Sequence, residues 1–160
     1  SIYIYDGLFK RILQESKYKG AYLILRTLLS FPQDKTAMVI SRWGKLFEPT
    51  IACGPLHPQR LKQRGFNQSH IIMGEYFKNT INTRHLLERV LNTHHIAHIS
   101  NKSKRKNEIK GAFRFCGKTL PKTALLIDDV ITSGATILEC AKTLKEKGVQ
   151  TVLAFSLAKG

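Results

Sequence analysis

Residues 125–136 read LLIDDVITSGAT, and this stretch decides the fold. It begins with a continuous apolar run, which is typical of a strand buried inside a parallel sheet. The run ends on two neighbouring acids, Asp128 and Asp129. In doubly wound α/β folds, ligands bind beyond the carboxyl ends of the strands. The stretch therefore predicts a buried strand over residues 124–127 that brings two carboxylates to a ligand site.

The residues after the acids are small and rich in hydroxyl groups. Gly134 allows the backbone to approach a ligand closely, and a helix predicted over residues 136–147 turns free amides and its positive end toward the same place. This combination predicts a phosphate cup, and the acids beside it predict a clamp for the two vicinal hydroxyls of a ribose. The predicted ribose 5-phosphate loop comprises Val130, Ile131, Thr132, Ser133, Gly134, Ala135 and Thr136.

Paired acids at a strand end have other uses in proteins. They also occur in metal sites and in phosphoacceptor sites, which do not need a Thr-Ser-Gly-x-Thr turn immediately after the acids. A purely structural role for Asp128 and Asp129 is the remaining alternative. We favour the ribose 5-phosphate site because it explains the whole segment.

The rest of the chain alternates between strand and helix patterns. Strand patterns occupy residues 2–5, 49–53, 86–91 and 149–157, and helical patterns lie between them. Asp6 is expected to cap a helix that runs to about Glu15, and Asn67 and Gln68 to cap a later one rather than touch a ligand. We predict one α/β domain over residues 1–160, with a doubly wound, mostly parallel sheet.

The chain is strongly basic, with a formal net charge of +15 at pH 7. Such a charge opposes compaction, so part of it is expected to face a phosphorylated ligand or a nucleic acid, although solubility alone is an alternative. Within a long polar loop predicted over residues 92–110, the cations either close over a diphosphate, grip a nucleic-acid backbone or are simply solvated. These nucleic-acid candidates are Lys102, Lys104, Arg105 and Lys106.

The sequence offers no framework for disulfides or zinc. Cys53, Cys116 and Cys140 lie far apart and form no CxxC pair, so buried, reduced cysteines in the cytoplasm are expected. The chain opens directly in a strand pattern without a signal peptide, which suggests that a preceding segment is missing. Residues 21–31 are too short an apolar run to span a bilayer. No membrane insertion is predicted.

Several motifs together resemble known families. Residues 125–136 resemble the phosphoribosyl pyrophosphate motif of type I phosphoribosyltransferases. Further landmarks resemble the competence protein F (ComF) family, which shares that fold: Lys17-Tyr18, the Pro-x-His-Pro loop at residues 55–58, the Arg-Gly-Phe-Asn-Gln string at residues 64–68, and Gly111-Ala112-Phe113. The string after the loop is the most specific of these, because ordinary salvage transferases lack it.

The resemblance implies the type I phosphoribosyltransferase fold, with phosphoribosyl pyrophosphate and Mg²⁺ as ligands. It also implies a cytoplasmic role in natural transformation, in which imported single-stranded DNA is handled beside other competence proteins. The family's N-terminal four-cysteine zinc finger has no counterpart here, so no zinc is predicted. A metabolic transferase that acts on a free base, and a non-catalytic module that uses the ligand as an effector, are alternatives.

Transfer of a phosphoribosyl group requires stabilisation of the departing pyrophosphate. Residues 54–64 follow a predicted strand, and the resemblance places the pyrophosphate loop there. We take His57, Arg60 and Arg64 as candidates for this side of the ligand, whereas Lys62 is better explained as a solvated charge. His94, His95 and His98 lack carboxylate or thiol companions, so no protein-held metal is predicted.

Overall fold

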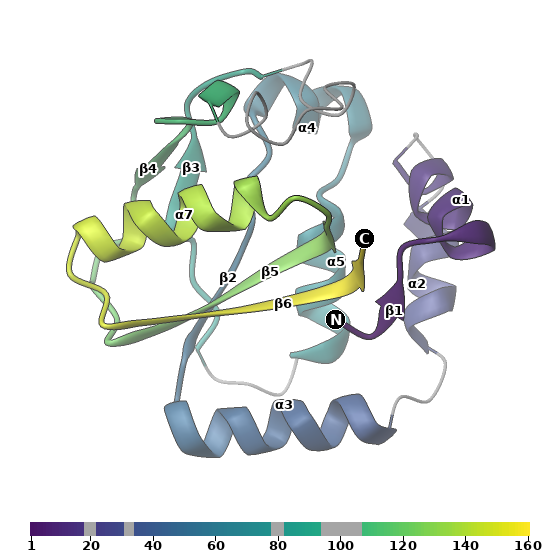
Figure 1. The fold of residues 1–160 in the computed structure, drawn as a ribbon, viewed down its shortest axis with the longest axis horizontal. Coiled ribbons are helices and arrows are strands. Elements are labelled where there is room, and N and C mark those ends of the chain that lie inside the picture. The colour runs from purple at the N-terminus through teal and green to yellow at the C-terminus, as the bar shows by residue number, and fades with distance from the viewer. Residues whose placement is uncertain (18–21, 31–33, 78–81, 94–106) are drawn as a thin grey trace.

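The centre of the protein is a wholly parallel sheet. The computed structural model describes residues 1–17, 22–30, 34–77, 82–93 and 107–160 (Figure 1). Its four-stranded sheet has the order β1-β6-β5-β2, and the members are β1 (Tyr3–Ile4), β2 (Thr50–Cys53), β5 (Thr123–Ile131) and β6 (Thr151–Lys159). The long pair of β5 and β6 runs side by side through the middle of the molecule (Figure 1). The predicted α/β class with a parallel sheet is confirmed.

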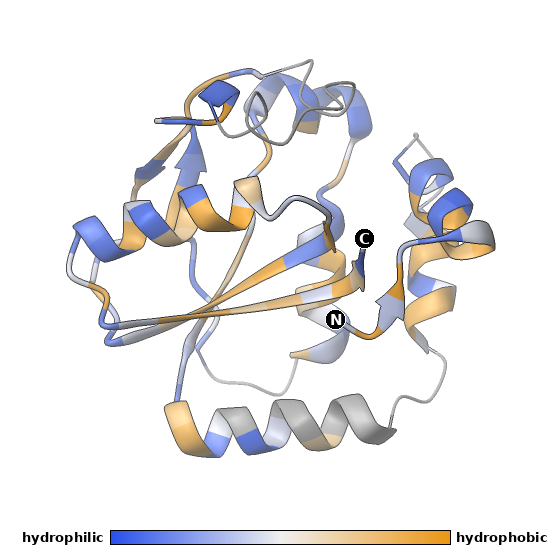
Figure 2. Ribbon diagram, in the orientation of Figure 1, coloured by the Kyte–Doolittle hydropathy of each residue, from blue (hydrophilic) through white to orange (hydrophobic). Residues whose placement is uncertain are grey.

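Both faces of the sheet are covered. Leu125 and Ile127 of β5 belong to an apolar cluster on one face, with residues of α1 (Gly7–Glu15), α2 (Tyr22–Ser30) and α5 (Gln68–Tyr76). Ala124 and Leu126 belong to a second cluster, which includes residues of α7 (Ala135–Glu146). Successive strand residues point to opposite faces, so β5 is apolar on both sides. Figure 2 shows this apolar strand with a hydrophilic segment near its carboxyl end. The arrangement is compatible with a doubly wound fold.

A second, smaller sheet lies beside the α7 cluster. It is antiparallel and consists of β3 (Leu87–Arg89) and β4 (Phe113–Phe115), with Arg89 opposite Phe113. The strand pattern at residues 86–91 predicts β3, but β4 is too short to show a period and was not predicted. Leu87 and Phe113 are buried against the α7 cluster. This contact attaches the small sheet to the main one.

The helix ends follow the predicted capping chemistry. Asp6 accepts a hydrogen bond of 2.7 Å from the Gly7 amide, and Asn67 accepts one of 3.0 Å from the Ser69 amide. The caps predicted at Asp6 and Asn67 are therefore confirmed, whereas Gln68 is the first residue of α5 and not its cap. Helix α3 runs from Asp34 to Phe47. No helix in the described ranges has both the length and the apolar character that crossing a bilayer requires.

The prediction that residues 54–64 form one basic loop is wrong for its second half. Residues Pro58–Arg64 form helix α4, which His57 caps and Gly65 ends in the left-handed region at φ 82°. Proline suits the first turn of a helix because the amide hydrogen that it lacks has no partner inside the helix there. Pro58 is accordingly the first residue of α4.

Candidate functional site

Asp128 and Asp129 lie in β5 near its carboxyl end, but the strand does not stop before them. Val130 pairs with Ala158 of β6, and Ile131 pairs with Lys159. Their side chains pack against the two apolar clusters, one on each face. The prediction that Val130 and Ile131 belong to the loop is therefore wrong, because pairing with the long neighbouring strand extends β5. The connection from β5 to α7 shortens to residues 132–134.

The carboxyl group of Asp128 is held in a confined position. Its Oδ1 accepts hydrogen bonds from the Asp129 amide at 2.9 Å and from the Ser69 hydroxyl at 3.3 Å. A Cβ placed on Gly54 would lie 3.7 Å from the same oxygen, so the end of β2 passes close to it. Burial, followed by the negative charge of Asp129, raises the pKa of Asp128 to about 8. These surroundings therefore favour the protonated form of this carboxyl group.

Asp129 has different surroundings. Its Oδ1 accepts a hydrogen bond of 2.9 Å from the Val130 amide, and its Oδ2 lies 3.5 Å from the Nζ atom of Lys17. Lys17 follows α1, whereas Ser69 beside Asp128 belongs to α5. The two carboxyl groups thus meet different elements. A protonated carboxyl donates a hydrogen bond and a carboxylate accepts one, so the pair suits a diol.

The turn after β5 leaves the start of α7 uncapped by its own N-cap residue. Gly134 occupies the N-cap at φ 73° and has no side chain to accept from the first amides. The Ser133 hydroxyl lies 3.4 Å from the Ala135 amide, and Thr136 stands in the first turn of α7. Helix N-termini carry partial positive charge and unsatisfied amides. The position therefore suits a phosphate next to the two acids.

Helix α4 and the residues after it lie on the β2 side of the acids. His57 accepts a hydrogen bond of 3.3 Å from the Gln59 amide through Nδ1, so this candidate ligand serves as a helix cap. Arg64 donates to Gln68 over 3.4 Å. Asn67, besides its capping role, donates through Nδ2 to the Gly54 carbonyl oxygen at 2.9 Å. This bond ties α5 to the segment beside Asp128.

Sequence reasoning missed one cation, Arg89 of β3. Partial burial, followed by the positive charge of Arg60, lowers the pKa of the Arg89 guanidinium, and Asp128 and Arg64 act on it as well. The structure therefore brings arginines from α4 and β3 into electrostatic reach of one another and of Asp128. A lone charge within a short predicted strand, residues 86–91, gives no sign of this in the sequence.

The remaining candidates are the predicted polar loop and the three cysteines. Residues 94–106, which include the cations Lys102, Lys104, Arg105 and Lys106 and the three predicted loop histidines, lie outside the described residues. Cys53 and Cys140 are buried, as expected, and burial raises the pKa of Cys53 to about 12. Cys116 is only partly buried, so that part of the prediction is wrong.

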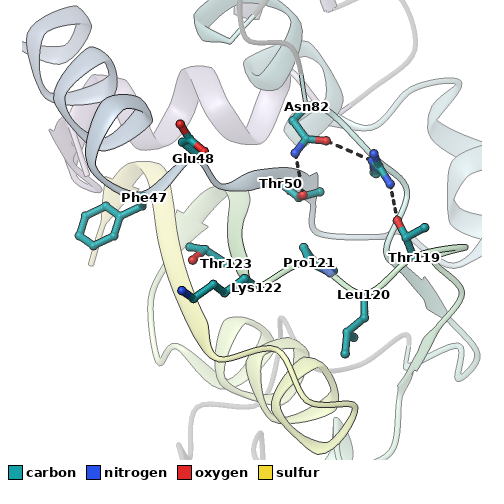
Figure 3. Close-up of a pocket in the computed structure, with 10 residues that line it drawn as sticks. Phe47, Glu48, Thr50, Asn82, Thr119, Leu120, Pro121, Lys122 and Thr123 are labelled. Atoms are coloured by element: carbon teal, nitrogen blue, oxygen red, sulfur yellow. Dashed lines mark hydrogen bonds between the residues drawn. The ribbon is translucent and has the colours of Figure 1, made fainter.

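A cavity of about 300 Å³ lies at the opposite end of the sheet (Figure 3). Thr50 and Thr123, which begin β2 and β5, line it, whereas the acids lie toward the end of β5. Several of its polar side chains bind one another: Asn82 donates to Thr50 over 3.0 Å (Figure 3), and Arg84 donates to Asn82 over 3.1 Å. These groups are satisfied within the protein, and the cavity takes no part in the candidate site.

Comparison with known proteins places the chain in a family. No family model matches it. Curated relatives are Competence protein ComFC of Streptococcus pneumoniae, 31% identical over 99% of this chain and 67% of the relative, and DNA utilization protein YhgH of Salmonella typhimurium, 32% identical over 99% and 70%. Competence protein F of Haemophilus influenzae is 31% identical over 92% and 66%. The chain thus spans about two thirds of each relative. It belongs to the competence protein F (ComF) family.

Proposed function

We propose that this protein binds phosphoribosyl pyrophosphate on a type I phosphoribosyltransferase fold and serves in the handling of DNA during natural transformation. One observation carries the first half of the proposal. Asp128 and Asp129 near the carboxyl end of β5 are followed, after a short connection, by the glycine-capped start of α7. A diol clamp and a phosphate cup on one continuous segment match a ribose 5-phosphate.

Each part of the ligand has a place in this proposal. Asp128 and Asp129 hold the ribose hydroxyls, and the amides at the start of α7 hold the 5-phosphate together with the hydroxyls of Thr132, Ser133 and Thr136. The diphosphate extends toward α4, where Arg60 and Arg64 supply positive charge. In a transfer reaction, these cations would stabilise the charge that develops on the departing pyrophosphate.

Mg²⁺ fits the same residues. The carboxylate oxygens of Asp129 are hard oxygen donors, the type of ligand that Mg²⁺ takes, and the cation would favour loss of the proton from Asp128 beside it. The Nζ atom of Lys17 lies 3.5 Å from Asp129 Oδ2, so this carboxylate already faces a cation. When bound with the diphosphate, Mg²⁺ supplies charge neutralisation at the leaving group.

Two observations support the role in DNA handling. The relatives named above are called competence and DNA utilization proteins, and the net charge of this chain is +15. A basic protein attracts the phosphates of a nucleic acid whatever the base sequence. We infer that the partner is single-stranded DNA in the cytoplasm, with other competence proteins beside it.

Calorimetry with phosphoribosyl pyrophosphate and Mg²⁺ tests the ligand. Wild type is expected to bind, and the double variant Asp128→Asn/Asp129→Asn is expected to lose binding while its circular dichroism spectrum stays unchanged, because the diol clamp is removed. The matched control is Glu15→Gln/Glu146→Gln, which makes two acid-to-amide changes of the same kind at exposed helix positions. Absence of binding by wild type, or equal binding by the double variant, contradicts the proposal.

A further inference from the structure

Strand β3 brings a cation toward the ligand site from outside the parallel sheet. Arg89 is the last residue of β3 and pairs in register with Phe113 of β4. Its guanidinium carbon lies 5.5 Å from the centre of the Phe113 ring. Stacking on an aromatic face is favourable for a guanidinium and defines its plane. The small antiparallel sheet, anchored by buried Phe113, thus orients Arg89.

Hydrogen bonds hold the same group from one side. Arg89 Nε donates to the Leu91 carbonyl oxygen at 3.3 Å, and Arg89 Nη2 donates to the Thr93 hydroxyl. Arginine has more N–H donors than these two bonds use, and they radiate in a planar fork. Within the described residues, the protein therefore fixes the orientation of this guanidinium while leaving it donors for a ligand.

The segment that carries Arg89 is joined to α4. Asn92, after β3, donates a hydrogen bond to Gln59 of α4. Arg60 and Arg64 of α4 act electrostatically on Arg89, and Asp128 is the acid among the groups that do so. Bringing three guanidinium groups together is unfavourable because like charges repel, more strongly where water is partly excluded. A ligand with several negative charges relieves this repulsion.

We propose that Arg89 binds the diphosphate of phosphoribosyl pyrophosphate together with Arg60 and Arg64. This inference rests on the proposed function and deepens it, since it assigns the diphosphate to the region between α4 and β3. The 5-phosphate belongs to a different element, the start of α7. A planar guanidinium fork matches the oxygens of a phosphate in a bidentate way that a single ammonium does not.

Arg114 of β4 provides a matched control. It lies in the same small sheet, is exposed and pairs with Glu88 through a contact of 2.7 Å between Nε and Oε1. Glu88 precedes Arg89 in β3, so the Glu88–Arg114 pair and the Arg89–Phe113 pair stand on opposite faces of the small sheet. Arg114→Gln therefore removes one positive charge from the same sheet on the other face.

Calorimetry with three probes separates the parts of the ligand. Arg89→Gln is expected to weaken the binding of phosphoribosyl pyrophosphate and of inorganic pyrophosphate by roughly tenfold to a hundredfold, the effect of removing one hydrogen bond between charged groups. Ribose 5-phosphate, which has no diphosphate, is expected to bind the variant and wild type equally. Arg114→Gln is expected to bind all three probes as wild type does.

The possible results are distinguishable. If Arg89→Gln binds phosphoribosyl pyrophosphate as tightly as wild type, the role of Arg89 is disproved while the proposed function stands. If wild type binds neither phosphoribosyl pyrophosphate nor ribose 5-phosphate, the proposed function fails, and the pyrophosphate titration still decides whether Arg89 holds a diphosphate. Should Arg89→Gln unfold, Arg89→Lys replaces it. That variant keeps the charge and loses the fork, so undiminished diphosphate affinity in it also disproves the role.

Discussion

At the scale of single residues, Asp128 and Asp129 carry the same carboxyl group but have different neighbours. Burial beside Gly54 and Ser69, followed by the charge of Asp129, raises the pKa of Asp128. Asp129 instead faces Lys17. The difference comes from the neighbouring elements, since Ser69 belongs to α5 and Lys17 follows α1. Burial thus favours the protonated form of Asp128, while Asp129 faces a cation.

The raised pKa of Asp128 predicts how stability depends on pH. An unfolded aspartate releases its proton near 3.8, whereas the folded protein keeps the Asp128 proton up to about 8. The folded state therefore binds more protons across this range, so the free energy of unfolding falls as the pH rises through it and levels off above about 8. Asp128→Asn removes this dependence. Its melting temperature relative to wild type is expected to climb between those two pH values.

Thermal unfolding of both proteins across this pH range provides the measurement. Glu88→Gln is a control of opposite sign, because the hydrogen bond from Arg114 lowers the pKa of Glu88. The stability that this exposed pair contributes is present above the ordinary pKa of 4.5 and is lost as the pH falls. Parallel melting profiles of wild type and Asp128→Asn would contradict the assignment.

At the scale of elements, the helices differ in how they begin. Side chains of Asp6 and Asn67 cap α1 and α5, but α7 begins at a glycine. Side-chain caps satisfy the amides that a helix N-terminus leaves open. A glycine at the N-cap leaves amides of α7 for a ligand, next to the acids of β5. The capped starts of α1 and α5 are therefore structural, whereas the start of α7 is proposed to bind a ligand.

Substitution of two glycines tests this distinction. Gly134→Ala is expected to lower the free energy of unfolding by about 1–2 kcal/mol, because φ at Gly134 is 73° and a side chain is strained there. A Cβ would meet Leu138 at 3.8 Å, so the loss comes from the backbone rather than from a clash. Gly74→Ala within α5, where a Cβ meets nothing within 4 Å, is expected to gain up to about 1 kcal/mol.

Urea denaturation of the two variants gives both values. Affinity for phosphoribosyl pyrophosphate is expected to fall in Gly134→Ala and to stay unchanged in Gly74→Ala. If Gly134→Ala and wild type had the same free energy of unfolding, the turn would accept a side chain without strain. If the affinity for phosphoribosyl pyrophosphate were also unchanged, the start of α7 would not belong to the proposed site.

At the scale of the whole molecule, the excess of positive charge is the dominant property. The formal net charge is +15, and some of it is concentrated where α4 and β3 meet. A second dense group of cations lies in residues 102–106 of the sequence. Small phosphorylated ligands and DNA are both attracted by this positive charge. Their affinities differ in how steeply they fall as the salt concentration rises.

Salt dependence therefore tests DNA binding. The affinity for a fluorescent single-stranded oligonucleotide, followed by anisotropy, is expected to fall linearly on a double logarithmic plot against salt. Replacement of Lys102, Lys104, Arg105 and Lys106 by glutamine is expected to lower the slope by up to about 3, at about 0.7 for each DNA phosphate that the variant no longer neutralises. The control replaces four exposed lysines elsewhere, Lys118, Lys122, Lys142 and Lys147. Equal slopes in the two variants would rule out residues 102–106 as the DNA-binding segment. If the protein did not bind the oligonucleotide even at low salt, single-stranded DNA would be ruled out as its partner.

The amino-acid sequence by itself determined the features that depend on near neighbours. The apolar run before Asp128, the turn at Gly134 and the caps at Asp6 and Asn67 were all predictable. Each depends on backbone preferences and hydrogen bonds that span only a few residues. Even there, the end of β5 was misplaced, because pairing with β6 carries the strand through Val130 and Ile131.

Only the tertiary structure decided what surrounds the acids. Ser69 reaches Asp128 from 59 residues away, and Lys17 and Arg89 come from still other elements. The packing of α5 and β2 against β5 buries the Asp128 carboxyl group and raises its pKa. Desolvation and electrostatic interactions add up over neighbours in space rather than in sequence. For this reason the acids were predictable, while the raised pKa of Asp128 and the approach of Arg89 were not.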